Sequence, residues 1–374
     1  MKKQHRRDFL RTGGLVAVAA IFPLGCDKND VRFKSMPLAP GMDVPMGTEL
    51  DAAPITPNER FYLQSINGPN YDPSLRAEEW RLRVDGLVDN PLDALRYEDI
   101  TGLPMVRQVI TLQCIGNWIG GPLVGNAEWG GTPLRQVLEM AGVKEETLRV
   151  KFYSVDGYTT SIPIEDALSE ETLLVWEMNG EVLPSKHGYP LRLINPGNYG
   201  QKMPKWIERI ELIDEVYLGY WESKPENKSF KWSDDAVATV NSRIDAPLSV
   251  WDDVSDPANG NVQRVLQRIA GTVGELFVIH GIAMAGERSI EKVEVSSDGG
   301  QTWEIARLTS ASVPNVWVTW AYEWPLPSRG NYEIVVRATD SAGDMQPVED
   351  AGADLYDGRT GWHRVPVEVA TPTS

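Results

Sequence analysis

The chain has 374 residues and a formal net charge of −17, and 42% of its residues are hydrophobic. This length exceeds what one hydrophobic core usually supports, so it favours two domains, and the composition is that of an ordinary soluble globular protein. The acidic balance excludes a nucleic-acid-binding class, because binding to phosphates requires a basic face. It favours basic protein partners or cationic substrates instead.

Residues 1–26 have the pattern of an export signal. Arg6 and Arg7 form an adjacent pair that precedes an apolar run too short to cross a bilayer. The pair matches the twin-arginine address, which predicts export to the periplasm or another extracytoplasmic compartment. Cys26 is a candidate for lipid attachment, although Pro23 fits such a cleavage site poorly. Removal of the signal changes the net charge from −17 to about −21.

The next segments combine strands and helices. Residues 27–60 show little periodicity and are expected to form an extended arm around the body. Up to about residue 215, runs with a period of two alternate with runs at helical spacing, separated by turn residues. The pattern predicts a strand over 81–88, a helix over 133–143, a hairpin over 148–164 that turns at Asp156-Gly157, a short helix over 165–168 and a strand over 172–180.

The composition changes near Asn241, after which strand follows strand. Several short strands without an intervening helix predict a β-sandwich of immunoglobulin type. We place the linker within 222–245 and divide the chain into domains over 27–235 and 236–374. The predicted strands cover 271–283, a hairpin over 290–308 that turns at Asp298-Gly299-Gly300, 315–324 and 331–340.

Most motifs of metal, nucleotide and hydrolase chemistry are missing from the sequence. There is no H-E-x-x-H, C-x-x-C, C-x-x-C-H for haem attachment, G-x-G-x-x-G or G-x-S-x-G. Only His187, His280 and His363 follow the signal, which is a short supply of ligands for zinc.

Cys114 is the only cysteine after Cys26, so it has no partner for an internal disulfide once the signal is removed or lipidated. A lone cysteine before glycine is more often a packed small residue than a ligand. Gly116 and Asn117 nevertheless favour a turn that presents the thiol, and Trp118 could shield it from water. A soft thiolate suits a soft transition metal.

The surrounding motifs resemble a known family. Q-C-I-G-N over 113–117 is followed by W-G-G-T-P-L-R-Q-V-L-E-M-A-G-V over 129–143 and by W-E-M-N-G-E-V-L-P-S-K-H-G-Y-P-L-R over 176–192. V-E-V-S-S-D-G-G-Q-T-W and R-A-T-D-S-A-G-D-M-Q-P continue the pattern after residue 290. In this order the motifs resemble the sulfite oxidase family of molybdopterin-dependent oxidoreductases, from about residue 55 to 370. The resemblance implies an α+β fold, in which a mixed molybdopterin domain precedes an immunoglobulin-like β-sandwich.

The resemblance also implies roles for individual residues near the cofactor. Cys114 would be the thiolate ligand of molybdenum. His187 and Arg192 would bind the pterin and its phosphate, since a guanidinium matches a phosphate with two parallel hydrogen bonds. Lys205 would be a further contact to the cofactor, and Asp156 lies where the family has a pterin-contacting aspartate.

Two further residues would serve the reaction itself. Tyr217 aligns with the family's active-site tyrosine, which can donate a hydrogen bond and transfer a proton. Tyr220 is the alternative if the register shifts. Arg359 matches an arginine that the sandwich domain lends to the substrate pocket, and Arg364 is the alternative there.

The substrate pocket departs from sulfite-oxidising members of the family. Those members have arginine after Q-C-x-G-N, where this chain has Trp118. Gln64 takes the place of a second arginine, and Ile66 that of a pterin-contacting histidine. Desolvating a doubly charged anion without paired cations costs several kcal/mol. The departures therefore favour a neutral or organic substrate, such as a sulfoxide.

The resemblance implies two-electron oxygen-atom transfer on a small sulfur-containing substrate at a molybdenum cofactor. Since the chain carries no haem motif, electrons are expected to reach a separate c-type cytochrome or membrane redox partner. The sandwich domain of the family implies a homodimer.

Three other functions remain open at this stage. A true sulfite dehydrogenase would take its missing charges from Lys202 or Arg359. A cofactor-free binding module would have kept the fold and lost the chemistry. A reactive cysteine of the peroxidase type would act through Cys114 without any metal.

Overall fold

The computed structural model describes residues 53–223, 231–247, 266–349, 355–356 and 358–371, all of which lie within the unit Glu49–Ser374. The predicted export signal, Cys26 and most of the predicted arm lie outside the described residues. Within the described ranges, no helix has the length and apolarity needed to cross a membrane.

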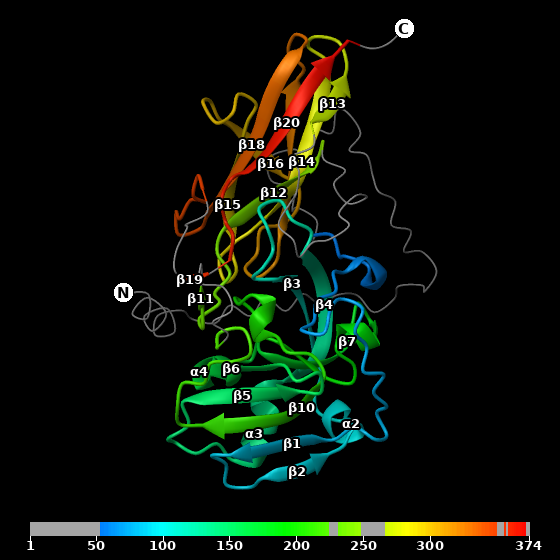
Figure 1. Ribbon diagram of the computed structural model, residues 1–374, viewed down its shortest axis with the longest axis vertical. Helices are drawn as coiled ribbons and strands as arrows, with labels where there is room; N and C mark the ends of the chain where they lie inside the picture. Colours follow the sequence, from blue (N-terminus) through cyan, green and yellow to red (C-terminus); the bar gives the residue numbers. More distant parts are fainter. Residues whose placement is uncertain (1–52, 224–230, 248–265, 350–354, 357, 372–374) are drawn as a thin grey trace. The chain divides into compact units, whose positions relative to one another are not determined.

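Two five-stranded sheets form the first domain (Figure 1). One has the order β2-β1-β10-β5-β6 and the other has the order β3-β4-β7-β8, with β9 paired to β7. β1 runs parallel to β10, and the other pairs are antiparallel. The strands are β1 (Leu82–Gly86), β2 (Leu92–Leu95), β3 (Val106–Gln113), β4 (Val124–Pro133), β5 (Arg149–Ser154), β6 (Thr159–Pro163), β7 (Leu173–Met178), β8 (Glu181–Val182), β9 (Arg192–Ile194) and β10 (Ile207–Ile213).

Short helices connect these strands. They are η1 (Asn58–Arg60), α2 (Tyr97–Thr101), α3 (Leu134–Ala141), α4 (Ile164–Ala167), η2 (Ser185–His187) and η3 (Gly200–Lys202). The helix predicted over 133–143 is confirmed as α3, which follows Pro133 and ends at Gly142 with a left-handed φ of 73°. Proline suits a helix start because it needs no N–H there, and glycine adopts the left-handed end without a steric penalty. The predicted hairpin over 148–164 is confirmed as β5 and β6.

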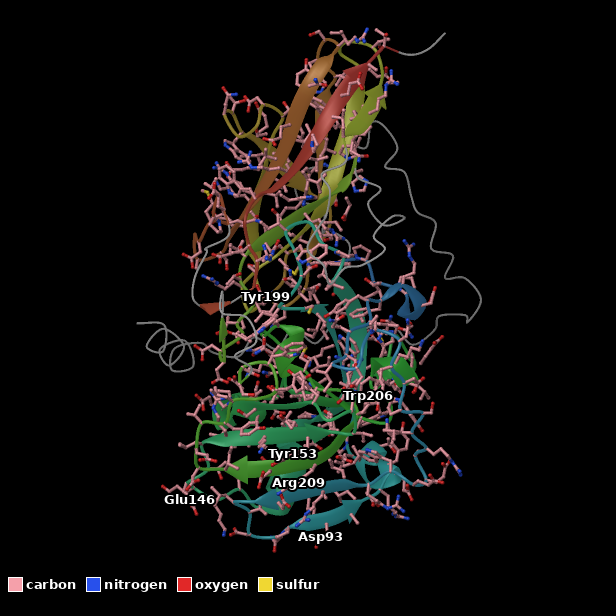
Figure 2. All side chains as sticks on the ribbon, viewed as in Figure 1. Asp93, Glu146, Tyr153, Tyr199, Trp206 and Arg209 are labelled. Atoms are coloured by element: carbon pink, nitrogen blue, oxygen red, sulfur yellow. The ribbon has the colours of Figure 1, made fainter. Side chains whose placement is uncertain are left out.

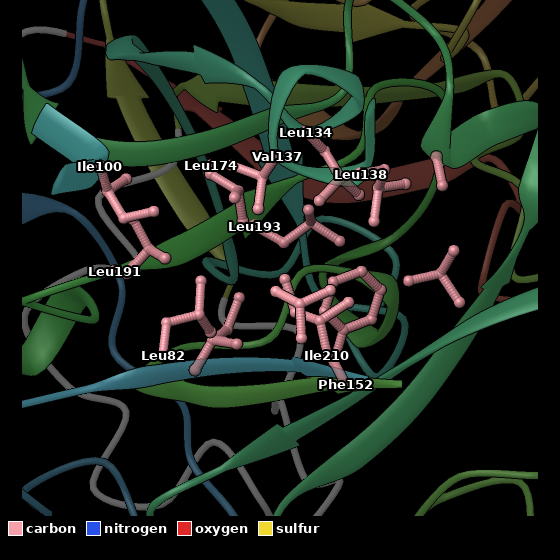
Figure 3. Packing of buried hydrophobic residues seen from close by; sticks show 14 of the residues in the cluster. Leu82, Ile100, Leu134, Val137, Leu138, Phe152, Leu174, Leu191, Leu193 and Ile210 are labelled. Carbon is pink, nitrogen blue, oxygen red and sulfur yellow. The ribbon is translucent and has the colours of Figure 1, made fainter. Parts of the chain in front are cut away.

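The larger apolar core of the first domain lies between α3 and the β1-β10-β5 sheet (Figure 3). Leu134 and Leu138 of α3, Phe152 of β5 and Ile210 of β10 are fully or almost fully buried in this cluster. A second cluster around Trp129 and Val175 holds β3, β4 and β7 together. The two clusters fix the strand ends from which the site residues project.

The second domain is the predicted β-sandwich, with strands in the order β12-β14-β17-β16-β15-β18-β20-β13. Its core includes Ile279, Val293, Trp320 and Val336. Outside this order, the short strands β11 (Lys231–Trp232) and β19 (Leu355–Tyr356) pair in parallel. The sandwich strands are β12 (Asn241–Ala246), β13 (Gln267–Ala270), β14 (Leu276–Met284), β15 (Ile290–Ser296), β16 (Glu304–Leu308), β17 (Val318–Pro325), β18 (Gly330–Asp340) and β20 (His363–Ala370).

The fold class predicted from the sequence is therefore confirmed, with shifts at strand ends. The strand predicted from residue 271 begins only at Leu276, because Gly274 has a φ of 86° and forms a turn. The predicted domain boundary at 235/236 falls between β11 and β12, and it stays a prediction.

Candidate active site

Cys114 lies in the loop between β3 and β4, and backbone hydrogen bonds hold its position. Its N–H donates to the carbonyl of Leu123 over 2.9 Å, and its own carbonyl accepts from the N–H of Asn117 over 2.9 Å. Asn117 Oδ1 accepts from the N–H of Leu123 over 2.8 Å. A Cβ added at Gly121 would lie 2.5 Å from that Oδ1 atom, so the loop requires glycine there. The Q-C-x-G-N motif is thus a closed turn around the thiol.

Side chains of the second domain also hold this loop. Arg243 donates from Nη1 to the carbonyl of Gly121 over 3.1 Å. A Cβ added at Gly120 would lie 2.2 Å from His363 Nε2, and Gly120 has a φ of 73°. The other ring nitrogen of His363, Nδ1, accepts from the N–H of Ile244 over 3.0 Å. The position of the thiol therefore depends on both domains.

The thiol of Cys114 is free and only partly exposed. Burial raises its pKa to about 11, although a backbone hydrogen bond from Gly116 opposes this shift. The protein groups alone therefore keep the thiol protonated near neutral pH, which is unfavourable for a nucleophilic cysteine. A bound metal cation would supply the positive charge that a thiolate needs.

Aromatic residues surround the thiol. A Cβ added at Gly116 would lie 3.7 Å from both the Cys114 Sγ atom and the ring of Trp232. Tyr62 and Tyr158 lie close enough that the charge of Cys114 raises their hydroxyl pKa values, beyond the larger effect of burial. Both phenols therefore remain protonated hydrogen-bond donors across the physiological pH range.

Arg192, at the start of β9, is buried and lies close to Tyr62. Its guanidinium lies 4.7 Å from the ring centroid of Trp129, and Nη1 donates to the carbonyl of His187 over 2.8 Å. The buried Nε atom has no hydrogen-bond partner among the described residues. Burial lowers the pKa of Arg192 to about 10. This guanidinium is a cation without a carboxylate partner in the described part of the chain.

Lys205 is a second cation on the same side. Burial and the charge of Arg192 lower its pKa to about 7, while Asp156 and Asp72 raise it. Its Nζ atom donates to the carbonyl of Lys186 over 2.9 Å and lies 4.1 Å from the ring centroid of Trp206, which is labelled in Figure 2.

Gly188 separates the two cations. Its φ is 122°, and an added Cβ would lie 3.0 Å from the Arg192 Cβ atom and 3.1 Å from the Lys205 Cβ atom. A larger residue would fill the space between them, so glycine keeps this position open. We call Gly188, Arg192 and Lys205 the cation cradle.

His187 precedes the cradle as a neutral ring. Burial, Arg192 and Lys205 lower its pKa to about 4, and its Nε2 atom donates to the carbonyl of Asn58 over 3.0 Å. A neutral imidazole beside two cations suits a hydrogen bond to a pterin rather than a further charge contact.

Asp156 is placed near the cradle by the β5–β6 turn. Its Oδ1 atom accepts from the N–H of Tyr158 over 3.0 Å, and its carbonyl accepts from Asn67. Burial raises the pKa of Asp156, and Lys205 opposes this shift. The structure thus brings His187, Arg192, Lys205 and Asp156 together, as the resemblance implies.

The cradle passes a test of fit for a phosphorylated cofactor. Arg192 and Lys205 are both buried, and the charge of Arg192 lowers the pKa of Lys205, so the two cations are unfavourable together unless an anion lies near them. A phosphate provides that anion and can accept a hydrogen bond from the unpartnered Arg192 Nε atom. The fold and the site therefore fit the class of proteins that bind a phosphorylated cofactor, and Tyr62 lies within electrostatic reach of both Arg192 and the thiol of Cys114.

Comparisons with known proteins agree with this class. Residues 69–221 match the family described as oxidoreductase molybdopterin binding domain, and residues 258–370 match the Mo-co oxidoreductase dimerisation domain. The chain is 31% identical to the sulfite oxidase of Gallus gallus, over 91% of this chain and 81% of that protein. It is 30% identical to the sulfite oxidase of Arabidopsis thaliana, over 86% and 90% of the two chains. The chain therefore belongs to the sulfite oxidase family, and it is a molybdopterin-dependent oxidoreductase that uses Mo-co.

Two further similarities concern the extent of the match and the fold. The chain spans 62% of the mitochondrial sulfite oxidase of Homo sapiens, to which it is 30% identical. The sulfane dehydrogenase SoxCD from Paracoccus pantotrophus has the same fold, with a TM-score of 0.65 and 23% identity over 87% of this chain and 91% of that one.

The structure places Tyr217 beside β5 and β6. Its hydroxyl is 3.0 Å from Thr159 Oγ1, its carbonyl accepts from Ser161, and Lys151 Nζ lies 3.7 Å from its ring centroid. Tyr220, the alternative, lies 6.1 Å from Tyr158 between ring centroids. The contacts of Tyr220 therefore lead toward Cys114, and the role of Tyr217 stays a prediction.

Arg359 is exposed, and its carbonyl accepts a hydrogen bond from Asn241 over 2.7 Å. The preceding residue, Gly358, lies against the ring of Tyr199, which packs with Ile115 next to Cys114. The chain segment of Arg359 thus approaches the site. Arg364 instead donates to Glu333 and to the carbonyl of Gly299 within the sandwich.

Of the residues that depart from sulfite-oxidising members, Gln64 is exposed and Trp118 is partly exposed. The carbonyl of Trp118 accepts from the N–H of Gly121 over 2.8 Å, which belongs to the turn around Cys114. Whether these two residues replace arginines in space stays a prediction.

Three residues near the thiol escaped the sequence analysis, namely Tyr62, Tyr158 and Trp232. Each lies far from Cys114 in sequence. The only available signal was indirect, since Tyr62 precedes the departure at Gln64 and Tyr158 follows the Asp156-Gly157 turn.

We expect Arg192→Gln to release the cofactor. The change removes the charge that faces the phosphate, and a hydrogen bond to a charged group contributes about 1.5–3 kcal/mol, or about 10- to 150-fold in affinity. Molybdenum and pterin contents of the purified protein measure the loss. Arg135→Gln, which changes an arginine of α3 exposed to solvent, is the matched control. Full cofactor content in Arg192→Gln would show that the cradle does not bind it.

The pH dependence of stability tests the neutral state of His187. Its folded pKa of about 4 lies below the ordinary value of 6.5, so the unfolded chain binds the proton first as the pH falls. Cofactor-free protein should lose stability between pH 6.5 and 4, by up to about 3 kcal/mol from this residue. His187→Gln keeps the donor to Asn58 but does not titrate. The difference in unfolding free energy between the two proteins should shrink over this range, and parallel curves would contradict the buried neutral ring.

Proposed function

We propose that the chain transfers an oxygen atom between water and a small sulfur compound of low charge, namely a sulfoxide or its thioether. The cofactor, when bound, supplies the two-electron chemistry. Cys114 would hold its metal, while Arg192, Lys205 and His187 would hold the pterin and its phosphate. The class of substrate then depends on which positive charges of the chain are not used by the cofactor.

The proposal depends mainly on the ion pairs of Lys202, the lysine that the sulfite dehydrogenase alternative would use to bind an anion. It is fully buried, and its Nζ atom lies 2.5 Å from Glu222 Oε1 and 3.1 Å from Asp234 Oδ1. Two carboxylates therefore compensate its charge. Since Arg192 and Lys205 belong to the cofactor cradle, none of these three cations is available to a dianion such as sulfite.

The groups around Cys114 suit a neutral substrate instead. Trp232 offers an apolar wall, and Tyr62 is a phenol that stays protonated because burial raises its pKa well above the usual value. A protonated phenol can donate to the oxygen of a sulfoxide. Transfer from water to these apolar surroundings also costs a neutral molecule less hydration free energy than it costs a dianion.

The remaining parts of the proposal concern location and partners. The twin-arginine signal supports export of the folded protein to the periplasm or another extracytoplasmic space. The acidic charge supports electron exchange with a basic c-type cytochrome or a membrane redox protein. The match to a Mo-co dimerisation domain supports a homodimer through the sandwich.

Metal analysis and a substrate comparison test this function together. Wild-type protein should hold about one molybdenum per chain and should turn over a sulfoxide or thioether with a kcat/KM at least tenfold above that for sulfite. Cys114→Ser should retain pterin but lose most activity, because oxygen is a poorer donor than sulfur for this metal. A higher kcat/KM for sulfite would establish the sulfite dehydrogenase alternative. Protein without molybdenum, from a host that loads other molybdenum enzymes, would favour the cofactor-free binding module.

Export depends on the arginine pair rather than on its charge. Replacing both Arg6 and Arg7 by lysine keeps the charge, and we expect the protein to accumulate in the cytoplasm, as measured by cell fractionation. Arg11→Lys makes the same chemical change outside the pair and should leave export intact. Normal export of the double variant would show that another pathway carries the chain.

A further inference from the structure

A second buried cluster combines four charged side chains with a threonine. It consists of Arg149, Thr160, Lys202, Glu222 and Asp234, which we call the relay network. Lys202 donates to Glu222 Oε1 over 2.5 Å, to Asp234 Oδ1 over 3.1 Å and to Thr160 Oγ1 over 3.4 Å. Arg149 completes it with two hydrogen bonds to Asp234, over 3.2 and 2.5 Å.

Stability alone is a weak reason to keep this network. Its two positive and two negative charges sum to zero, and burying such groups costs several kcal/mol per ion that their attraction only partly offsets. Lys202 and Glu222 have side-chain exposures of 2% and 1%, so they bear this cost in full. Apolar residues of similar volume would often be equally stable there. A chemical task would explain the charges.

One carboxylate oxygen of Glu222 accepts no hydrogen bond from the residues that the structure describes. Its Oε1 atom accepts from Lys202 and from Thr160, but its buried Oε2 atom has no hydrogen-bond partner among the described residues. An unpartnered carboxylate oxygen in a buried position is unfavourable unless a proton or a donor reaches it.

The network is connected to the site through Tyr158. The hydroxyl of Tyr158 donates to the carbonyl of Gln201 over 2.6 Å, and Gln201 precedes Lys202 in η3. Charges on both Glu222 and Cys114 raise the pKa of Tyr158, and a hydrogen bond with Thr160 opposes this. Tyr158 therefore lies within electrostatic reach of the site on one side and of the network on the other.

At its other end the network reaches the solvent. The side chain of Asp234 is 21% exposed, in contrast to Lys202 and Glu222. Asp234 also follows Trp232, the residue beside Gly116, by two positions. The hydrogen bonds thus run from the buried carboxylate of Glu222 to a carboxylate that water can reach.

The proposed reaction needs such a route. When a thioether is oxidised, one S–O bond forms, both O–H bonds of water break, and two protons and two electrons leave the site. Two one-electron haem-protein acceptors take the electrons in turn, and the protons need a path of their own. In the reverse direction the same two protons must be delivered.

We propose that Glu222 takes up the protons released beside Cys114 and passes them through the relay network to Asp234 and the solvent. Lys202 can accept a proton from Glu222 only as it hands one to Asp234, and Arg149 keeps Asp234 in place. The inference rests on oxygen-atom transfer as the proposed function, but not on the identity of the sulfur compound.

Infrared difference spectroscopy on the holoenzyme tests the protonation directly. The metal is reduced with dithionite and reoxidised with ferricyanide, so no substrate is required. A carboxylic acid C=O band should appear on reduction in the wild type and be absent from Glu222→Gln. Glu294→Gln, which removes a carboxylate from an ion-paired cluster of the sandwich, is the matched control and should keep the band. A wild-type spectrum without the band, or an unchanged band in Glu222→Gln, would overturn the inference.

Kinetics provide the second measurement. Loss of a positioned proton acceptor costs about 10²- to 10⁴-fold in rate, so Glu222→Gln should turn over at least 100-fold more slowly at unchanged molybdenum content, with an increased solvent deuterium isotope effect. Asp234→Asn, at the exposed end, should show the same increase with a smaller rate loss, and it serves as the test if Glu222→Gln fails to fold. Wild-type rates and isotope effects in the folded variants would overturn the relay. Failure of the proposed function is distinguishable, because it would leave the wild type without turnover while the infrared band remained.

Discussion

The site depends on the burial of positive charge without a matching carboxylate. Burial lowers the pKa of Arg192, burial and the charge of Arg192 lower the pKa of Lys205, and the described part of the chain offers Arg192 no acidic partner. Folding brings them together because η2, β9 and the segment after η3 converge on a single glycine. Such an arrangement is unfavourable in the empty protein and becomes favourable when a phosphate enters. Cofactor binding and the stability of this region are therefore one equilibrium.

Lys202, three residues before Lys205, is a buried cation in the opposite situation. Lys202 is equally buried, but Glu222 and Asp234 neutralise it, so this cation exerts little attraction on a ligand. The cation cradle therefore lacks a compensating anion, whereas the relay network is already neutral, although Lys202 and Lys205 are only three residues apart. An enzyme that oxidises a dianion requires uncompensated positive charge in two places, one for the cofactor and one for the substrate. Among the three cations just described, this chain provides such charge only at the cofactor cradle, and on this ground we propose a substrate of low charge.

Local features of the fold could be predicted from the sequence, and motifs also carry the candidate cofactor residues, whose roles stay predictions. The spacing of Leu134, Val137 and Leu138 is sufficient to define α3, and the Asp156-Gly157 turn defines the β5–β6 hairpin. Tyr62, Tyr158 and Trp232 could not be found this way, because their nearness to Cys114 arises from tertiary packing alone. For the same reason the resemblance of the motifs indicates Tyr217, whereas the ring of Tyr220 lies next to that of Tyr158 in the structure. Charge compensation at Lys202 is likewise invisible in a sequence, since Glu222 and Asp234 lie on different segments.

The thiol and the second domain together suggest when the cofactor enters. Burial raises the pKa of Cys114 to about 11, so a thiolate forms there only in the company of a cation, and a free thiol in this loop is a poor nucleophile toward oxidants. Arg243 and His363 from the sandwich then hold the loop at Gly121 and Gly120, which links the position of the metal ligand to the folding of both domains. A cofactor seated between such groups is most easily inserted before the domains close on the loop. Loading would therefore precede the export that we propose, and the twin-arginine pathway, which carries folded proteins, would be compatible with this order.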